Sequence, residues 1–225
     1  MTKGFQVAID GPASAGKSTV AKLVAQKFGY IYCDTGAMYR AVTLAALQQK
    51  IDLNDQVKVA AIAENLPLRF EAGDPQQVWL GDQNVTQLIR TNEVAQNVST
   101  VAAIPAVRQA MVKMQREIAS QNDIVMDGRD IGTTVLPQAP VKIFMVASAH
   151  ERARRRYLDN QARGIATQSI EELQKAIELR DQKDSTRKVS PLVQAADAIR
   201  LDTTALTIDE VVNEISEIIK KVKDN

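Results

Sequence analysis

The sequence predicts an α/β fold in which helices cover both faces of a parallel β-sheet. Two observations support this prediction. Short apolar segments suited to buried strands alternate with longer segments whose apolar residues recur at helical spacing. A glycine-rich loop also joins the first of these strands to the first helix. Such alternation is typical of parallel sheets, whose strands are buried on both faces.

The glycine-rich loop matches the pattern G-x-x-x-x-G-K-[ST]. It comprises Gly11, Pro12, Ala13, Ser14, Ala15, Gly16, Lys17 and Ser18, followed by Thr19. An apolar run at residues 5–9 precedes it, and a helical pattern over 17–28 follows it. This arrangement directs backbone N–H groups and the positive end of a helix dipole at a phosphate. We therefore predict a nucleoside triphosphate site, with Lys17 at the β- and γ-phosphates and Ser18 on Mg²⁺.

The remaining elements follow in alternation. Four further apolar runs predict strands over residues 30–33, 124–126, 141–146 and 198–201. Residues 36–49 place apolar side chains on one helical face, and Pro105 suits the first position of a helix that runs to about residue 120. The capping boxes Ser169-x-x-Glu172 and Thr207-x-x-Glu210 predict the starts of two more helices.

One segment interrupts this alternation. Residues 66–70, 77–80 and 84–86 are short strand-like runs separated by turn residues, which predicts a small antiparallel sheet. We interpret about 60–103 as an insertion into a single domain that spans 1–225. The arginine-rich segment at about 150–167, which includes Gly164, is the candidate for a lid.

Composition excludes several classes of function. The 225-residue chain has a net charge of +1, so no charge excess points to nucleic acid or a membrane surface. Its single cysteine, Cys33, excludes an internal disulfide, and its single histidine, His150, excludes a multi-histidine metal site. No apolar stretch approaches the ~20 residues of a membrane span. We expect a cytoplasmic protein, monomeric, with no polymeric nucleic acid and no membrane as partner.

The second substrate is indicated by the loops that follow the strands. The chain has no Asn-Lys-x-Asp or D-x-x-G run, which GTPases normally carry. Arginines and carboxylates instead follow two strands, in the segments 34–40 and 127–130. Ligands of α/β proteins bind at such strand ends, and arginine beside aspartate suits an anionic acceptor. Arg180, Asp184 and Arg187 would share one helical face, although alone they could form a solvated salt-bridge stripe.

Together these motifs resemble bacterial cytidylate kinases. The resemblance rests on residues 11–19, Asp34-Thr-Gly-Ala-Met-Tyr-Arg40, Asp127-Gly-Arg-Asp-Ile-Gly-Thr133 and Arg180-Asp-x-x-Asp-x-x-Arg187, and it covers essentially the whole chain. It implies a three-layer P-loop fold with a five-stranded parallel sheet in the order 2-3-1-4-5. It also implies that the insertion binds a nucleoside monophosphate and that the lid is short.

The same resemblance assigns roles to individual residues. The acceptor phosphate would be surrounded by Thr35, Tyr39, Arg40 and Arg129, with Arg187 nearby, and the cytosine by Ser99, Arg108 and Asp130. Arg180 and Asp184 would hold the ribose. From the lid, Arg152 would bind ATP, and Arg155 and Arg156 would join Lys17 and Arg129 in catalysis. Asp127 is our candidate for support of Mg²⁺ beside Ser18.

The reaction implied is MgATP plus CMP or dCMP giving ADP plus (d)CDP, a step of pyrimidine nucleotide metabolism. No catalytic base is needed, because a nucleotide phosphate has a second pKa near ~6 and is already dianionic at neutral pH. Two alternatives stay open at this point. The chain could be another small P-loop kinase, acting on UMP or on a small metabolite such as shikimate, or an ATP-dependent switch or binding module.

Overall fold

The computed structural model describes residues 4–71, 73, 76–162, 164 and 168–224. The chain forms two compact units. The first unit consists of Met1–Cys33 and Ile118–Asn225, and the second unit is the continuous segment Asp34–Glu117. Among the described residues, no helix combines the length and the apolar character needed to cross a bilayer.

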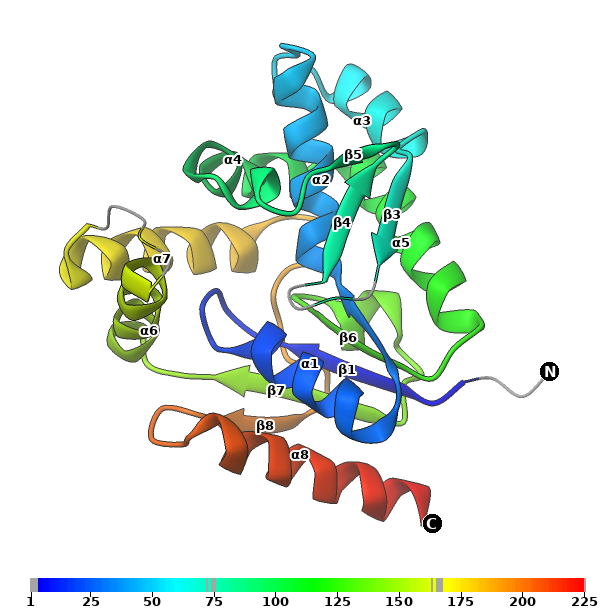
Figure 1. Cartoon of the computed structure of the whole chain (residues 1–225), viewed down its shortest axis with the longest axis vertical. Coiled ribbons are helices and arrows are strands. Elements are labelled where there is room, and N and C mark those ends of the chain that lie inside the picture. Colours follow the sequence, from blue (N-terminus) through cyan, green and yellow to red (C-terminus); the bar gives the residue numbers. More distant parts are fainter. Residues whose placement is uncertain (1–3, 72, 74–75, 163, 165–167, 225) are drawn as a thin grey trace. The chain divides into compact units, whose positions relative to one another are not determined.

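The first unit contains a five-stranded sheet in the order β2-β6-β1-β7-β8 (Figure 1). The strands are β1 (Gln6–Asp10), β2 (Ile31–Asp34), β6 (Ile124–Gly128), β7 (Val141–Val146) and β8 (Ile199–Asp202). The central strand β1 pairs in parallel with both β6 and β7, and β7 pairs in parallel with β8. Numbered among themselves, these strands have the predicted order 2-3-1-4-5, so the prediction of fold class is confirmed.

Two helices, α1 (Lys17–Phe28) and α8 (Ile208–Lys223), pack together on one face of this sheet (Figure 1). Their buried residues Val20, Val24, Ile215 and Ile219 share one apolar cluster with residues of β1 and β7. The predicted capping box at Thr207 is present, since its side chain accepts the Glu210 N–H and the Glu210 carboxylate accepts the Thr207 N–H. This apolar layer holds the start of α1, and hence the end of the glycine-rich loop, against the sheet.

Helices α6 (Ala149–Ala162) and α7 (Ile170–Thr186) also belong to the first unit and pack against each other (Figure 1). The predicted capping box opens α7, with Ser169 and Glu172 as its partners. A π-helical turn, η2 (Ile131–Val135), follows β6 and was not predicted. Residues 163 and 165–167 of the predicted lid lie outside the described part of the chain.

The second unit combines helices with a three-stranded antiparallel sheet. Its elements are α2 (Thr35–Gln48), α3 (Gln56–Glu64), β3 (Leu68–Glu71), β4 (Gln77–Leu80), β5 (Gln83–Asn84), η1 (Leu88–Arg90), α4 (Asn92–Ala102) and α5 (Pro105–Ser120), the last of which extends past the end of the unit. The strand order β3-β4-β5 confirms the predicted small sheet. The sequence analysis did not predict α3 and α4.

Candidate active site

The glycine-rich loop runs from the end of β1 to the start of α1, and its backbone explains both glycines of the pattern. Gly11 has φ of 148°, and a Cβ there would lie 2.0 Å from the Met145 carbonyl oxygen. Gly16 has φ of 85° and caps α1 in the left-handed region. A side chain at either position would strain the backbone or collide with β7. The two glycines therefore let the loop turn sharply against the sheet and begin α1.

Lys17 is buried in the first turn of α1, and its Nζ donates a hydrogen bond to the Pro12 carbonyl at 2.7 Å. Burial, aided by the Arg129 charge, lowers the pKa of Lys17 to about 7 despite the opposing charges of Asp127 and Asp10. A buried ammonium with so low a pKa gains strongly from a nearby anion. The loop thus holds a lysine whose charged form a phosphate would stabilise.

Ser18, Asp127 and Tyr32 form a polar cluster beside the loop. Ser18 Oγ donates to Asp127 Oδ2 at 2.9 Å, and the Tyr32 hydroxyl donates to Asp127 Oδ1, also at 2.9 Å. The two predicted metal-site residues are therefore in direct contact. Among the described residues, no group of three or more histidine, cysteine, aspartate or glutamate side chains could hold a metal ion. One hydroxyl and one carboxylate fit Mg²⁺, which keeps several waters and takes further ligands from substrate phosphates.

Asp10 was missed by the sequence analysis, although it ends β1 directly before the loop. Its two carboxylate oxygens accept the backbone N–H groups of Ile131 and Gly132 at 2.8 and 2.7 Å. Burial raises the pKa of Asp10 to about 6, against the two hydrogen bonds, which lower it. Asp10 thus connects the strand before the loop to η2, which follows residues 127–130. In the sequence, the only sign of this role is that Asp10 is a single carboxylate at the end of an apolar strand.

A second polar cluster of the first unit joins the segment after β6 to α7. Arg129 Nε donates to Asp184 Oδ2 at 2.9 Å, and Arg180 Nε lies 3.9 Å from the same oxygen. Burial opposes ionisation of Asp184, but the Arg129 and Arg180 charges outweigh it and hold the pKa below its ordinary 3.8. Arg187 Nη2 lies 3.6 Å from Asp130 Oδ1. Five predicted acceptor-site residues are thereby brought together, with three positive charges against two negative ones.

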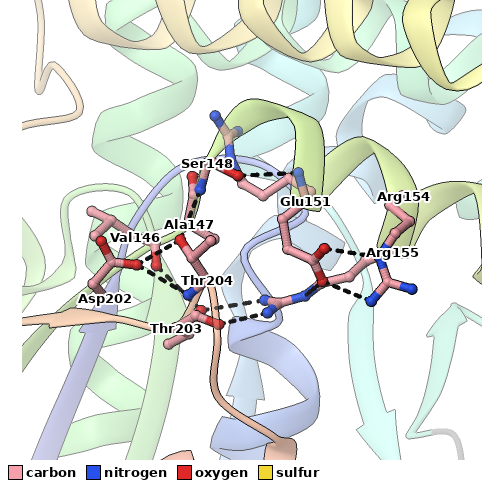
Figure 2. Close-up of polar contacts among 10 residues, drawn as sticks. Val146, Ala147, Ser148, Glu151, Arg154, Arg155, Asp202, Thr203 and Thr204 are labelled. Carbon is pink, nitrogen blue, oxygen red and sulfur yellow. Dashed lines mark hydrogen bonds and ion pairs between the residues drawn. The ribbon is translucent and has the colours of Figure 1, made fainter.

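The arginines of α6 differ in their surroundings (Figure 2). Arg155 donates through Nη1 to Thr203 Oγ1 at 3.2 Å, through Nη2 to the Thr203 carbonyl at 2.6 Å, and through Nε to Glu151 Oε1 at 3.0 Å. A Cβ at Gly16 would lie 3.9 Å from Arg155 Nη1, so this guanidinium adjoins the loop. Arg154 is exposed and pairs with Glu151, and Arg156 is also exposed.

Arg152 is buried, unlike the three arginines that follow it. Its guanidinium donates to the carbonyl oxygens of Ala147 and Ala13 and to Asp181. The predicted ATP-binding arginine is therefore in contact with the backbone of the loop itself. His150, which the sequence analysis did not select, is exposed at the start of the same helix.

The other predicted acceptor residues belong to the second unit. Asp34 caps α2 by accepting the Ala37 N–H at 2.8 Å, and its second oxygen accepts Arg40 Nη2 at 2.8 Å. Thr35 and Tyr39, in the first two turns of α2, are buried. Arg40 Nε is also buried, with no hydrogen-bond partner within the described residues. A buried donor of this kind suits an anionic ligand.

Arg108, on α5, is buried. Its guanidinium carbon lies 5.3 Å from the centre of the Tyr39 ring, and Nη1 donates to the Ala102 carbonyl at 3.3 Å. Ser99 lies on the same helix, α4, that supplies this carbonyl, three residues earlier. The α2, α4 and α5 helices thus gather the predicted phosphate and base residues of this unit, while Arg129, Asp130, Arg180, Asp184 and Arg187 belong to the first unit.

Comparisons with known proteins identify the family of this chain. The family model "Cytidylate kinase" matches residues 7–221. The cytidylate kinase of Limosilactobacillus reuteri (strain DSM 20016) is 72% identical over 225 residues, which are 100% of this chain and 99% of the relative. That of Limosilactobacillus fermentum is 71% identical over 221 residues, 98% of each chain.

Among solved structures, a gluconokinase from Sinorhizobium meliloti has a TM-score of 0.51 at 12% identity, with 100% of this chain and 97% of that chain covered. At this identity the likeness concerns the fold alone, and it agrees with the P-loop kinase architecture described above. The family model and the close relatives, each spanning nearly the whole chain, go further. This chain belongs to the cytidylate kinase family.

Proposed function

We propose that the chain transfers the γ-phosphoryl group of MgATP to CMP or dCMP, as a step of pyrimidine nucleotide metabolism in the cytoplasm. The observation that carries the proposal is the match of the cytidylate kinase family to residues 7–221, which include the whole loop with its buried Lys17. No observation favours either alternative function, a P-loop kinase that acts on a different acceptor or an ATP-dependent switch that transfers no phosphoryl group to an acceptor.

On the donor side, backbone N–H groups of the loop bind the ATP phosphates, except at Pro12, which has none, and at Ala13, whose N–H donates to Asp181. Lys17 leaves the Pro12 carbonyl to reach the β- and γ-phosphates. Ser18 and Asp127 hold Mg²⁺, directly or through water, and Tyr32 orients Asp127. Bound with ATP, the ion supplies charge neutralisation between the phosphates. Arg155 and Arg156 stabilise the transferred group from α6, and Arg155 already adjoins the loop at Gly16.

On the acceptor side, the obstacle is electrostatic, because two polyanions must meet in line. We assign the neutralisation of the acceptor phosphate to Arg40, Arg129 and Arg187, as the family resemblance implies, and Thr35 and Tyr39 would add hydroxyl groups. The buried Nε of Arg40 supports this role, because within the described residues it has no hydrogen-bond partner, although Nη2 of the same guanidinium pairs with Asp34. The acceptor oxygen is already an anion near neutral pH. Catalysis then reduces to positioning and charge stabilisation.

Recognition of the base and sugar falls to other residues. Asp130 accepts a hydrogen bond from the exocyclic amino group of cytosine, and Arg108 donates one to N3 or O2. Ser99 is the third residue assigned to contact the base. Uracil reverses the donor and acceptor at these positions, and each unpaired buried polar group costs ~1–3 kcal/mol. Selectivity of at least tenfold for cytosine is therefore expected. The Arg180–Asp184 pair holds the ribose hydroxyls, and Arg187, 3.6 Å from Asp130, orients that carboxylate.

The test is ADP release from MgATP in a coupled assay with CMP, dCMP, UMP, AMP, GMP and shikimate in turn. Turnover confined mainly to CMP and dCMP supports the proposal. Turnover with another acceptor contradicts the assignment of the cytosine-binding residues. ATP hydrolysis that does not depend on any acceptor indicates an ATP-dependent switch instead of a kinase. Arg108→Ala and Asp130→Ala should each raise KM for CMP more than KM for ATP, whereas equal effects on both substrates indicate a structural role.

A further inference from the structure

Ala13, in the middle of the glycine-rich loop, has both of its backbone polar groups held by one ion pair of the first unit. Its N–H donates to Asp181 Oδ1 at 3.1 Å, and its carbonyl accepts Arg152 Nη1 at 3.0 Å. The same Nη1 donates to Asp181 Oδ2 at 2.6 Å. Four groups thus close a ring of hydrogen bonds around one residue of the loop.

The ring is well shielded from water and anchored to the sheet. The Arg152 side chain is 7% exposed and that of Asp181 is 19% exposed. Arg152 Nε also donates to the Ala147 carbonyl at 3.0 Å, directly after β7. Arg152 comes from α6 and Asp181 from α7, so these two helices meet the loop through the pair. An ion pair with an exposed member, such as Arg154 at 51% exposure beside Glu151, contributes little, whereas a shielded pair with further hydrogen bonds fixes geometry.

We propose that Asp181, together with Arg152, is a positioning residue that fixes the shape of the phosphate-binding loop at Ala13. The inference rests on the proposed function, because it concerns the binding of MgATP to that loop. Asp181 immediately follows Arg180 on α7, and Asp184 lies one turn further on. The helix that contributes the ribose-binding pair therefore also contributes the support of the donor loop.

The charge of the bound triphosphate explains why Ala13 is held by an ion pair and not by a carboxylate alone. A carboxylate alone would accept the Ala13 N–H equally well, but it would place a negative charge beside a loop that binds a triphosphate. Arg152 neutralises this charge while it holds the carbonyl of the same residue. Removing Arg152 alone leaves an uncompensated carboxylate near the phosphates, and removing Asp181 alone leaves a cation, which the triphosphate tolerates.

The two roles considered for Arg152 therefore predict different results. If Arg152 acts through Asp181, then Asp181→Ala added to Arg152→Met should restore part of the lost ATP affinity, because the repelling carboxylate is gone. If Arg152 contacts ATP directly and Asp181 is only structural, the double variant should bind ATP no better than Arg152→Met.

The experiment measures KM for MgATP and for CMP, and the dissociation constant of a non-hydrolysable ATP analogue with Mg²⁺ by titration calorimetry. Hydrogen bonds to charged groups are worth roughly 1.5–3 kcal/mol, which corresponds to roughly ten- to a hundredfold. Asp181→Ala should weaken analogue binding about tenfold and raise KM for MgATP accordingly, while KM for CMP changes less than threefold. Arg152→Met should have a larger effect on the analogue, and the double variant an intermediate one.

Asp181→Asn is the conservative variant for the case that Asp181→Ala does not fold, because the amide oxygen of asparagine can still accept the Ala13 N–H. It should bind the analogue more tightly than Asp181→Ala. Arg154→Ala is the matched control, because Arg154 lies on the same helix with its side chain 51% exposed, and the variant should leave both KM values unchanged. Thermal unfolding confirms that each variant is folded.

The inference is overturned if folded Asp181→Ala keeps the wild-type KM for MgATP, or if the double variant is as weak as or weaker than Arg152→Met. Failure of the proposed function looks different. In that case the wild-type protein itself shows no transfer to CMP or dCMP, although calorimetry on the analogue can still report on the loop.

Discussion

Replacing Asp10 by asparagine removes a buried carboxyl group whose ionisation is linked to folding. Asp10 is 5% exposed, and burial raises its pKa from the ordinary value of 3.8 to about 6. The native state therefore holds this proton more tightly than the unfolded state does. The resulting stabilisation is complete below pH 3.8 and is lost as the pH rises through about 6.

The magnitude follows from the pKa values. At pH 8 the carboxyl group is ionised in both states and contributes nothing. At pH 5, about one unit below the native pKa and above the unfolded one, it contributes about 1.4 kcal/mol. Between pH 8 and pH 5 the wild-type protein should thus gain about 1.4 kcal/mol over Asp10→Asn from this carboxyl group.

Urea unfolding at the two pH values gives this difference directly. Asp55→Asn is the control: Asp55 is a partly exposed cap of α3 whose pKa is lowered, chiefly by its hydrogen bond with Lys58, so its contribution is lost only below pH 3.8. Its effect should be the same at pH 5 and pH 8. If the gap between wild type and Asp10→Asn is also constant, or widens in favour of wild type at pH 8, the pKa of Asp10 is not raised and the reasoning is refuted.

Three further predictions concern the loop and its surroundings. Gly11→Ala places a Cβ 2.0 Å from the Met145 carbonyl oxygen, so the loop must shift and the thermal midpoint and activity should both fall, which scanning calorimetry and the coupled assay measure. Tyr32→Phe removes the hydrogen bond to Asp127 and should raise the Mg²⁺ concentration needed for half-maximal rate at saturating ATP, while an unchanged Mg²⁺ dependence would count against a role for Tyr32. Lys17→Ala should abolish phosphoryl transfer and leave the circular dichroism spectrum intact; near-wild-type turnover would sink the assignment of the loop.

Much of the fold was predictable, because its signals are local. The apolar runs at 5–9 and 141–146 read directly as buried strands, and the capping boxes at Ser169 and Thr207 mark the starts of α7 and α8. Helix α3 was not predicted because it is short and is followed by the short strand β3, and α4 was not predicted because it lies in a segment interpreted from its strand-like runs. Their apolar faces become informative only once the packing of the second unit is known.

The residues assigned to the site stay a prediction, and their contacts could not be predicted from the sequence. Loop residues and strand-end arginines follow fixed motifs, whereas Asp10 and Asp181 acquire their roles from backbone groups that are distant in sequence. Asp181 lies within the stretch that carries the family resemblance, yet nothing local connects it to Ala13, 168 positions earlier. The division of the acceptor residues between two units also depends on tertiary structure. The predicted limits of the insertion, about 60–103, stay a prediction beside a second unit of Asp34–Glu117.

During synthesis on the ribosome, the two units can begin to fold at different times. The second unit is one continuous segment, so all of its partners are present once residue 117 has been made. The central strand β1, in contrast, pairs through Gln6 with Ile124 and through Val7 with Val141. Both edges of β1 therefore stay unpaired until its partner strands β6 and β7 have been synthesised. Such long-range pairing is slow, and the unpaired strand is prone to aggregation. The strand β1 and the loop that follows it are thus made early, but they cannot take their full place in the sheet until β7, which ends at Val146, has been made.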